Sequence, residues 1–169
     1  MIKYRETVPS PRWLILIGWA AAIGFGVGGV VYLLTDGPPM SGRLALGLFF
    51  LAMAVLWVAV SLIFDHLRIE VGEDGVRFGY GPLAKTIRAG ELVGVEVEPY
   101  PWLTYGGWGI RFSTRKRRAY SVPGCREGAA LLVHDGSRYH VSSRNAESLA
   151  SNLRHLVADR TGQATTPAS

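Results

Sequence analysis

The residues best suited to chemistry in this sequence are one cysteine and four histidines. His134 and His140 flank residues 135–136, an Asp-Gly pair typical of a hairpin turn, so a hairpin would bring the two imidazoles near each other. A metal site needs three or four ligands with supporting contacts, and no Cys-x-x-Cys or His-Glu-x-x-His spacing accompanies this pair. Cys125 with either histidine would supply a nucleophile and a base, but residues 123–126 match no nucleophile signature. We therefore expect exposed hairpin histidines, and we predict no catalytic residue, no metal and no cofactor.

Glycines at positions 106, 107 and 109 surround Trp108 in a pattern that could cradle a phosphate. A phosphate-binding loop of this kind requires a following Lys-Ser or Lys-Thr pair and an opening helix, and the sequence has neither here. We expect the glycines to permit a tight turn that lets Trp108 pack into the core. The aromatic residues just before them are expected in the core and over a sheet edge, with an interface contact as the alternative: Tyr100, Trp102 and Tyr105.

One dense run of basic residues, at 115–118, offers a binding surface rather than catalysis. One interpretation is a solvated hairpin tip; the other is attraction to anionic lipid headgroups, because the chain reaches this domain directly from an apolar run. Nucleic acid is disfavoured as a partner, since the run is a single patch without interleaved stacking aromatics. The candidate anionic-lipid contacts are Arg115, Lys116, Arg117, Arg118, Arg111 and Lys85.

The elements that must position these groups begin with two uncharged runs, Trp13 to Leu34 and Leu44 to Phe64. Each run would span about 30 Å as a helix, which is the thickness of the hydrocarbon core of a bilayer. The first is too long for the apolar core of a signal peptide. Of the 169 residues, 49% are hydrophobic and only 18% are charged, which argues against an ordinary soluble enzyme. We predict a small integral membrane protein with two transmembrane helices.

The connection between the two runs is short, so the helices should form an antiparallel hairpin. Basic residues flank the outer ends of the hairpin, whereas the connection contains only Arg43, so the positive-inside rule places both termini in the cytoplasm and the chain in the plasma membrane. The expected organisation is a cytoplasmic tail (1–12), a first span (13–34), an external loop (35–43), a second span (44–64), a cytoplasmic domain (65–158) and a flexible tail (159–169).

Small residues recur every four positions in the first run, at Ala20, Gly24 and Gly28. Such a face allows close approach of two helix backbones in lipid. We expect this face to pack against the second span, and the alternative is association with another membrane protein or with a second copy of the chain.

After the second run, apolar and polar residues alternate in short segments separated by glycine turns, which is typical of half-buried strands. The clearest hairpin covers residues 129–142, with Tyr139 and Val141 predicted to face inward. From residue 146 the apolar positions follow a helical period instead, on one face: Ala146, Leu149, Ala150, Leu153, Leu156 and Val157. The domain is therefore predicted as about seven antiparallel strands capped by a C-terminal α-helix.

This plan, together with residues 105–111, which read Tyr-Gly-Gly-Trp-Gly-Ile-Arg, resembles a family of small bacterial integral membrane proteins with a PH-like domain. The resemblance covers residues 65–157. It implies a fold and a membrane setting and supplies no catalytic residue. The leading hypothesis is a non-catalytic interaction module held at the inner membrane surface. The alternative is a small membrane enzyme or transporter accessory subunit that acts in lipid or envelope metabolism.

Overall fold

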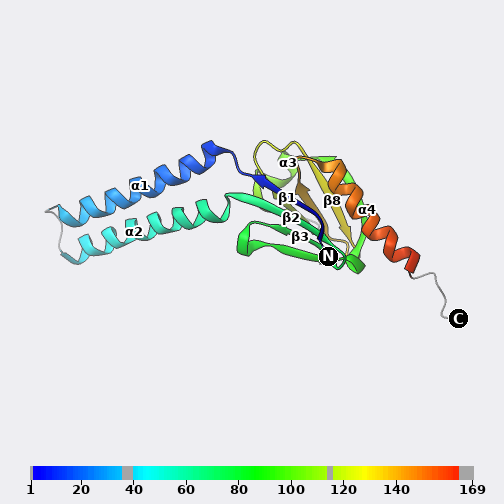
Figure 1. Cartoon of the computed structure of the whole chain (residues 1–169). Coiled ribbons are helices and arrows are strands. Elements are labelled where there is room, and N and C mark those ends of the chain that lie inside the picture. Colours follow the sequence, from blue (N-terminus) through cyan, green and yellow to red (C-terminus); the bar gives the residue numbers. More distant parts are fainter. Residues whose placement is uncertain (1, 36–39, 114–115, 164–169) are drawn as a thin grey trace. The chain divides into compact units, whose positions relative to one another are not determined.

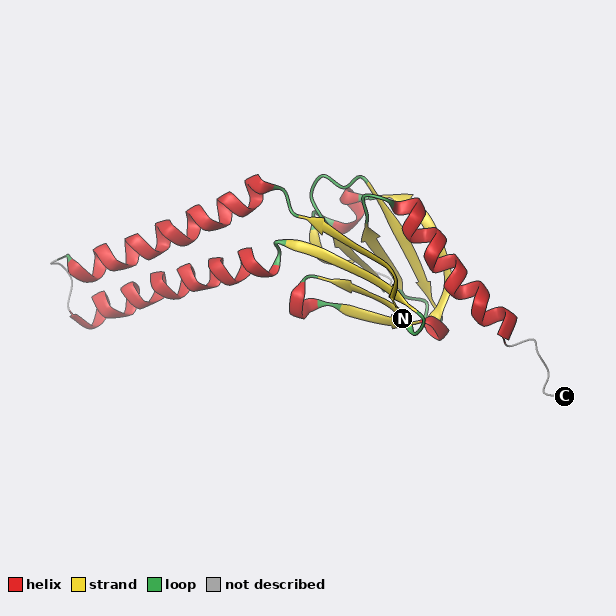
Figure 2. Ribbon diagram, viewed as in Figure 1, coloured by secondary structure: helices red, strands yellow, loops and turns green. Residues whose placement is uncertain are grey.

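The computed structural model describes residues 2–35, 40–113 and 116–163, and side chains up to residue 158. The chain divides into two compact units, a helical unit of Pro11–Asp65 and a strand unit of Met1–Ser10 with His66–Ser169 (Figures 1 and 2). The strand unit is therefore built from the segments that precede and follow the helical unit in the sequence.

The helical unit consists of helix α1 (Arg12–Leu34) and helix α2 (Met40–Ile63). Both are long and apolar enough to cross a membrane, as predicted, and only 17% of the most apolar 18 residues of α1 and 6% of those of α2 are buried. A core helix of a soluble protein would be mostly buried. The exposure of these two helices therefore suits association with a membrane.

The two helices pack through small residues, but through a different face from the one predicted. Gly18, Ala22 and Gly29 are the buried residues of α1. A Cβ at Gly29 would lie 3.1 Å from the Cβ of Phe50 in α2, whereas a Cβ at Gly24 or Gly28 would have no atom of α2 within 4 Å. The expectation that Ala20, Gly24 and Gly28 pack against the second helix is wrong, because α1 carries two small-residue faces and periodicity alone does not choose between them.

The first sheet has four antiparallel strands in sequential order (Figure 1). These are β1 (Ile2–Pro9), β2 (His66–Gly72), β3 (Gly75–Gly79) and β4 (Lys85–Arg88). The segment expected as a polar tail is thus a strand, with Pro9 paired to His66. It escaped prediction because the alternation of Ile2, Tyr4 and Val8 is interrupted by Glu6 and followed by two prolines within three residues.

The second sheet has five strands in the order β5-β8-β9-β7-β6. They are β5 (Leu92–Pro99), β6 (Gly109–Ser113), β7 (Arg117–Ser121), β8 (Glu127–Val133) and β9 (Arg138–Ser142). The predicted hairpin is confirmed as β8 and β9. The described residues after the helices thus form eight strands rather than about seven, and β1 adds a ninth. Strand β9 lies between β8 and β7 and pairs with β7 in parallel, whereas an all-antiparallel sheet was predicted.

The core joins the inner faces of the two sheets. The ring of Phe78 in β3 lies 5.0 Å from that of Tyr120 in β7 and 5.9 Å from that of Tyr139 in β9. Helix α4 (Ala146–Gln163) contacts β5 and β8. Its buried residues confirm the predicted apolar face: Ala146, Leu149, Ala150, Leu153 and Leu156. The helix continues past the predicted start of the tail, and residues 164–169 lie outside the described residues.

Three short helical segments connect strands: η1 (Gly81–Leu83), η2 (Ala89–Glu91) and α3 (Trp102–Tyr105). Tyr80, just before η1, donates a hydrogen bond of 2.6 Å to the Ser121 carbonyl at the end of β7. This contact and the core aromatics fix the two sheets against each other.

Candidate binding site

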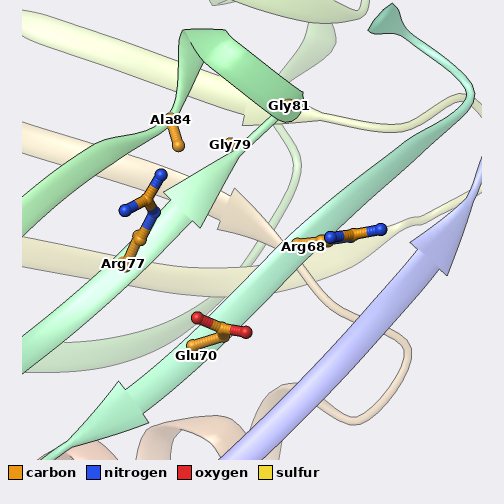
Figure 3. A pocket seen from close by; sticks show the side chains of 6 residues that line it. All are labelled: Arg68, Glu70, Arg77, Gly79, Gly81 and Ala84. Carbon is orange, nitrogen blue, oxygen red and sulfur yellow. The ribbon is translucent and has the colours of Figure 1, made fainter. Parts of the chain in front are cut away.

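The outer face of the first sheet carries an arginine-lined pocket. Its strands alternate buried apolar side chains with outward polar ones, so Leu67, Ile69 and Phe78 enter the core. Outward residues of β2 and β3, together with two residues of the η1 turn, line a pocket of about 160 Å³: Arg68, Glu70, Arg77, Gly79, Gly81 and Ala84 (Figure 3). Strand alternation therefore supplies the charge of this pocket.

Glycine shapes the floor of the pocket. Gly79 has φ of +149°, and a Cβ there would meet the Cα of Ala84 at 2.4 Å. Only glycine allows the chain to turn back so closely from β3 into η1. Gly81, with φ of +48°, has open space around its missing side chain. The turn thus presents exposed backbone beside the arginines.

Some charged side chains around the pocket have a hydrogen-bond or ion-pair partner among the described residues, and one does not. Glu70 is paired with Arg5, 3.1 Å away, and Arg68 Nε donates to His66 Nε2 at 2.8 Å. Arg77 has no hydrogen bond or ion pair with any residue that the structure describes. In Figure 3 its side chain reaches toward Ala84, while Arg68 reaches across the sheet in the other direction. A guanidinium that is exposed and unpaired is suited to bind a phosphate or carboxylate.

The ends of the strand unit differ in what they connect. We call the end with the Pro9–His66 pair the tether end, because α1 begins three residues after Pro9 and α2 ends three residues before His66. The Arg68–Gly79 pair lies at this end, and Tyr80 links it to Ser121. We call the opposite end, with the turns at 73–74 and 135–136, the distal end. The Asp74 carbonyl accepts from Ala89 N, and the Glu91 carbonyl from His134 N, which joins the two sheets there.

The six predicted lipid contacts do not form one surface. Lys116, Arg117 and Arg118 lie at the distal end, where Lys116 Nζ donates to the Asp135 carbonyl at 2.9 Å. Lys85 opens β4 near the pocket, and Arg111 Nε donates to the Trp108 carbonyl at 2.9 Å. Arg115 is outside the described residues. The described members of the predicted set are thus spread over both sheets.

His140 is completely buried, so the expectation of an exposed hairpin histidine is wrong for this residue. Its Nδ1 lies 3.2 Å from Glu98 Oε1, and its ring lies 4.9 Å from that of Tyr100. Tyr100 and Tyr105 stack with an interplanar angle of 3° and are both buried, as predicted. Alternation placed His140 correctly on the outer face of β9, but the loop that covers this face was not foreseen.

The polar groups around His140 form a closed cluster. The hydrogen bond from His140 lowers the pKa of the Glu98 carboxyl, and Arg138, whose Nη2 lies 2.6 Å from Glu98 Oε2, lowers it further against the opposing effect of burial. A Cβ at Gly128 would lie 2.7 Å from His140 Nε2. This nitrogen has no hydrogen-bond partner within the described part of the chain. A carboxylate and a fully buried imidazole are therefore paired, and the backbone at Gly128 packs closely against that imidazole.

The remaining candidates for chemistry are not assembled into a site. Burial raises the pKa of the Cys125 thiol, which opposes formation of a thiolate. In residues 2–35, 40–113 and 116–163, no three His, Cys, Asp or Glu side chains come together as a metal site.

Trp108 is 44% exposed, so the prediction that it packs into the core is wrong. The three glycines around it have φ of 69°, 123° and 92°, and this backbone interrupts the alternation of β6 before it reaches Trp108. Trp102 and Leu103 of α3 are also exposed, at 56% and 77%. The loop thus buries its tyrosines and exposes its tryptophans.

Comparison with protein-family models gives no match for this chain, and comparison with curated proteins gives none either.

Proposed function

We propose that the protein is a non-catalytic, membrane-anchored interaction module. In this proposal α1 and α2 cross the plasma membrane, both termini are cytoplasmic, and the strand unit is a PH-like domain held at the inner surface. The observation that carries it is the pair of long, exposed apolar helices joined to the strand unit by two short connections, Ser10-Pro11 and Phe64-Asp65. Connections of this length keep the strand unit next to whatever surrounds the helices.

The charge distribution supports the orientation. Arg12 precedes the apolar part of α1, and the strand unit supplies further basic residues close to both connections, including Arg5 and Arg68. The only basic residue near the connection of the two helices is Arg43. The positive-inside rule then favours a cytoplasmic strand unit.

The PH-like interpretation is supported by two sheets packed through a shared core and by a C-terminal helix against the second sheet. The strand order departs from the simple plan of seven antiparallel strands in its parallel β7–β9 pair and in the contribution of β1 from before the helices. These additions leave the proposed cap, helix α4, in place.

A binding role is favoured over the enzyme or transporter-accessory alternative by what the polar groups do. The imidazole of the Glu98–His140 pair is fully buried, whereas the open pocket offers an arginine with no partner among the described residues. The proposal also keeps the face of Ala20, Gly24 and Gly28 as a contact for a second copy or another membrane protein. That face is open because it does not pack against α2.

Reporter fusions to the full chain test the anchoring and the orientation. Alkaline phosphatase, which is active only outside, and green fluorescent protein, which folds only inside, would each be fused before residue 1 and after residue 169. We expect fluorescence and no phosphatase activity at both positions. Phosphatase activity at both ends would reverse the orientation, and recovery of the chain in the soluble fraction would overturn the anchoring.

A further inference from the structure

We propose that the tether end of the strand unit docks on an anionic lipid surface, with Trp102, Leu103, Trp108 and Leu83 entering the interface and Arg77 binding a lipid phosphate. This inference rests on the proposed membrane anchoring and assigns it a specific surface.

The first step is the placement of the apolar side chains. Leu83 belongs to η1, whose first turn is closed by a hydrogen bond from Leu83 N to the Tyr80 carbonyl. Tyr80 in turn binds Ser121, which pairs with Gly109, the residue after Trp108. Helix α3 and η1 therefore lie at the same end of the unit as the Pro9–His66 pair (Figure 2).

The second step is the exposure of these side chains. Leu83 is 46% exposed, Trp108 44%, Trp102 56% and Leu103 77%. Exposure of two tryptophans and two leucines at one end is unfavourable in water and lowers solubility. Tryptophan is enriched at membrane–water interfaces, where its ring is partly apolar and its N–H reaches polar groups. A bilayer surface is thus an occupant that suits both parts of these side chains.

The third step is charge complementarity. Exposed cations lie at this end or reach toward it. Arg68 pairs with Gly79 there, and Lys85 opens β4. Arg77 and Arg111 lie mid-strand; the side chain of Arg77 reaches toward Ala84 (Figure 3), and that of Arg111 reaches toward the Trp108 carbonyl. The nearby carboxylate of Glu70 is neutralised by Arg5, and Asp65 lies in the connection from α2. A net positive rim around exposed tryptophans matches anionic headgroups.

The pocket supplies the specific contact within that rim. Arg77 is unpaired, and the turn at Gly79 to Gly81 leaves backbone exposed beside it. A phosphate at Arg77 would accept from the guanidinium while its lipid chains enter the layer reached by Leu83. The ligand is therefore assigned as a phospholipid headgroup phosphate.

The distal end provides a matched comparison. Val93, one residue into β5, is 52% exposed but lies next to Leu92, which pairs with Val133 at the distal end. Arg88 pairs with Gly75 at the distal end of the same outer face that carries Arg77. Val93 is thus the control for Leu103, and Arg88 is the control for Arg77.

The experiment uses the full chain in nanodiscs with Cys125→Ser, and a polarity-sensitive fluorophore on either Leu103→Cys or Val93→Cys. The discs contain phosphatidylcholine alone or with phosphatidylglycerol, and a lipid spin-labelled at a shallow acyl position serves as quencher. We expect a blue shift and quenching at position 103, stronger with phosphatidylglycerol, and neither at position 93. An unquenched probe at position 103 would overturn the docking, while the reporter fusions would still test the anchoring separately.

The phosphate contact is tested by Arg77→Gln against Arg88→Gln in the position-103 reporter. A basic residue near an anionic surface changes the docked-to-undocked ratio about fivefold. We expect that loss for Arg77→Gln in discs with phosphatidylglycerol, and no change for Arg88→Gln. Equal effects of the two substitutions would overturn the assignment of Arg77. A response to inorganic phosphate in lipid-free micelles, without a response to phosphatidylglycerol, would assign the pocket to a soluble phosphate and overturn the lipid assignment.

Discussion

The outer faces of the two sheets carry similar residue types and use them in opposite ways. On the first sheet, Arg77 is exposed and unpaired beside a pocket. On the second sheet, Glu98 and His140 are held together beneath Tyr100 and Tyr105. The difference is the loop that follows β5, whose tyrosines cover one face, whereas η1 borders the pocket on the other face and leaves Arg77 exposed. Titratable side chains thus become a binding site or an internal cluster according to what covers them.

The largest expected loss of stability comes from a substitution in the loop that covers His140. Tyr100→Ala removes a buried ring stacked on Tyr105 and its hydrogen bond to the Gly107 carbonyl. Removing a buried aromatic ring costs about 3–5 kcal/mol in the free energy of unfolding. Guanidinium unfolding of the full chain in detergent micelles, followed by near-ultraviolet circular dichroism, would measure it. The control is Trp102→Ala in the same loop, which is exposed and should cost less than about 1 kcal/mol; similar losses for both would show that Tyr100 is no part of a cover.

A second prediction concerns the tight packing beneath the cover. In Gly128→Ala the new Cβ would meet the Val141 carbonyl oxygen at 2.3 Å and His140 Nε2 at 2.7 Å. Overpacking of this kind costs about 1–3 kcal/mol. Gly94→Ala in the same sheet, whose nearest neighbour would be Leu132 at 3.6 Å, should leave the unfolding midpoint nearly unchanged. Equal tolerance of both substitutions would mean that the space around His140 is not closed.

The charge of the internal cluster gives the third prediction. Glu98→Gln weakens the contacts to Arg138 and His140, and hydrogen bonds to charged groups contribute about 1.5–3 kcal/mol. We expect a loss of about 2 kcal/mol at neutral pH, measured by the same unfolding experiment.

The pH dependence has a definite sign. Because the hydrogen bond from His140 and the charge of Arg138 lower the pKa of Glu98 in the folded protein, the stabilisation is present above the ordinary carboxyl pKa and is lost as the pH falls through the lowered value. Glu98→Gln should therefore flatten the acid side of the stability profile. If the difference in unfolding free energy between the wild type and Glu98→Gln stayed the same at every acidic pH, this linkage would be contradicted.

The smallest effect is expected on the open face. Glu70→Gln breaks the pair with Arg5, in which the arginine side chain is 63% exposed and the glutamate side chain 32%. Exposed ion pairs contribute about 0–1 kcal/mol, so we expect a change of about 0.5 kcal/mol that disappears at high salt. A loss as large as that of Glu98→Gln would remove the contrast between the two faces.

The elements that could be predicted from the sequence are those with a regular local period of apolar residues. The helical period of Leu149 and Leu153 and the alternation around Tyr139 depend on residues a few positions apart, and both elements are present. The outward positions of Arg68 and Arg77 follow from the same alternation, although the pocket between them was not recognised, because it requires the turn at Gly79.

The pairing of β1 and the burial of His140 could not be predicted, because both depend on contacts between segments distant in the sequence. Glu6 accepts from Ser143 Oγ at 2.6 Å and from the Arg144 backbone at 2.8 Å, and Tyr4 donates to Glu6 as well. Burial and this carboxylate raise the pKa of Tyr4 to about 12. No pattern within residues 1–12 indicates a partner 137 positions away. The same holds for His140, whose cover comes from a loop with no regular period.

The arrangement of β1 and β2 has a consequence for the order of events during synthesis. Strand β1 is made before α1 and α2, whereas its partner β2 is made after them. Until then the edge of β1 has no strand to pair with, and Glu6 also lacks Ser143 and Arg144, which are made later still. The pairing of Pro9 with His66 requires the far ends of a chain segment that includes both helices to return to one place. Completion of the first sheet is thus a late step that can follow only when the helical hairpin has brought its two ends together.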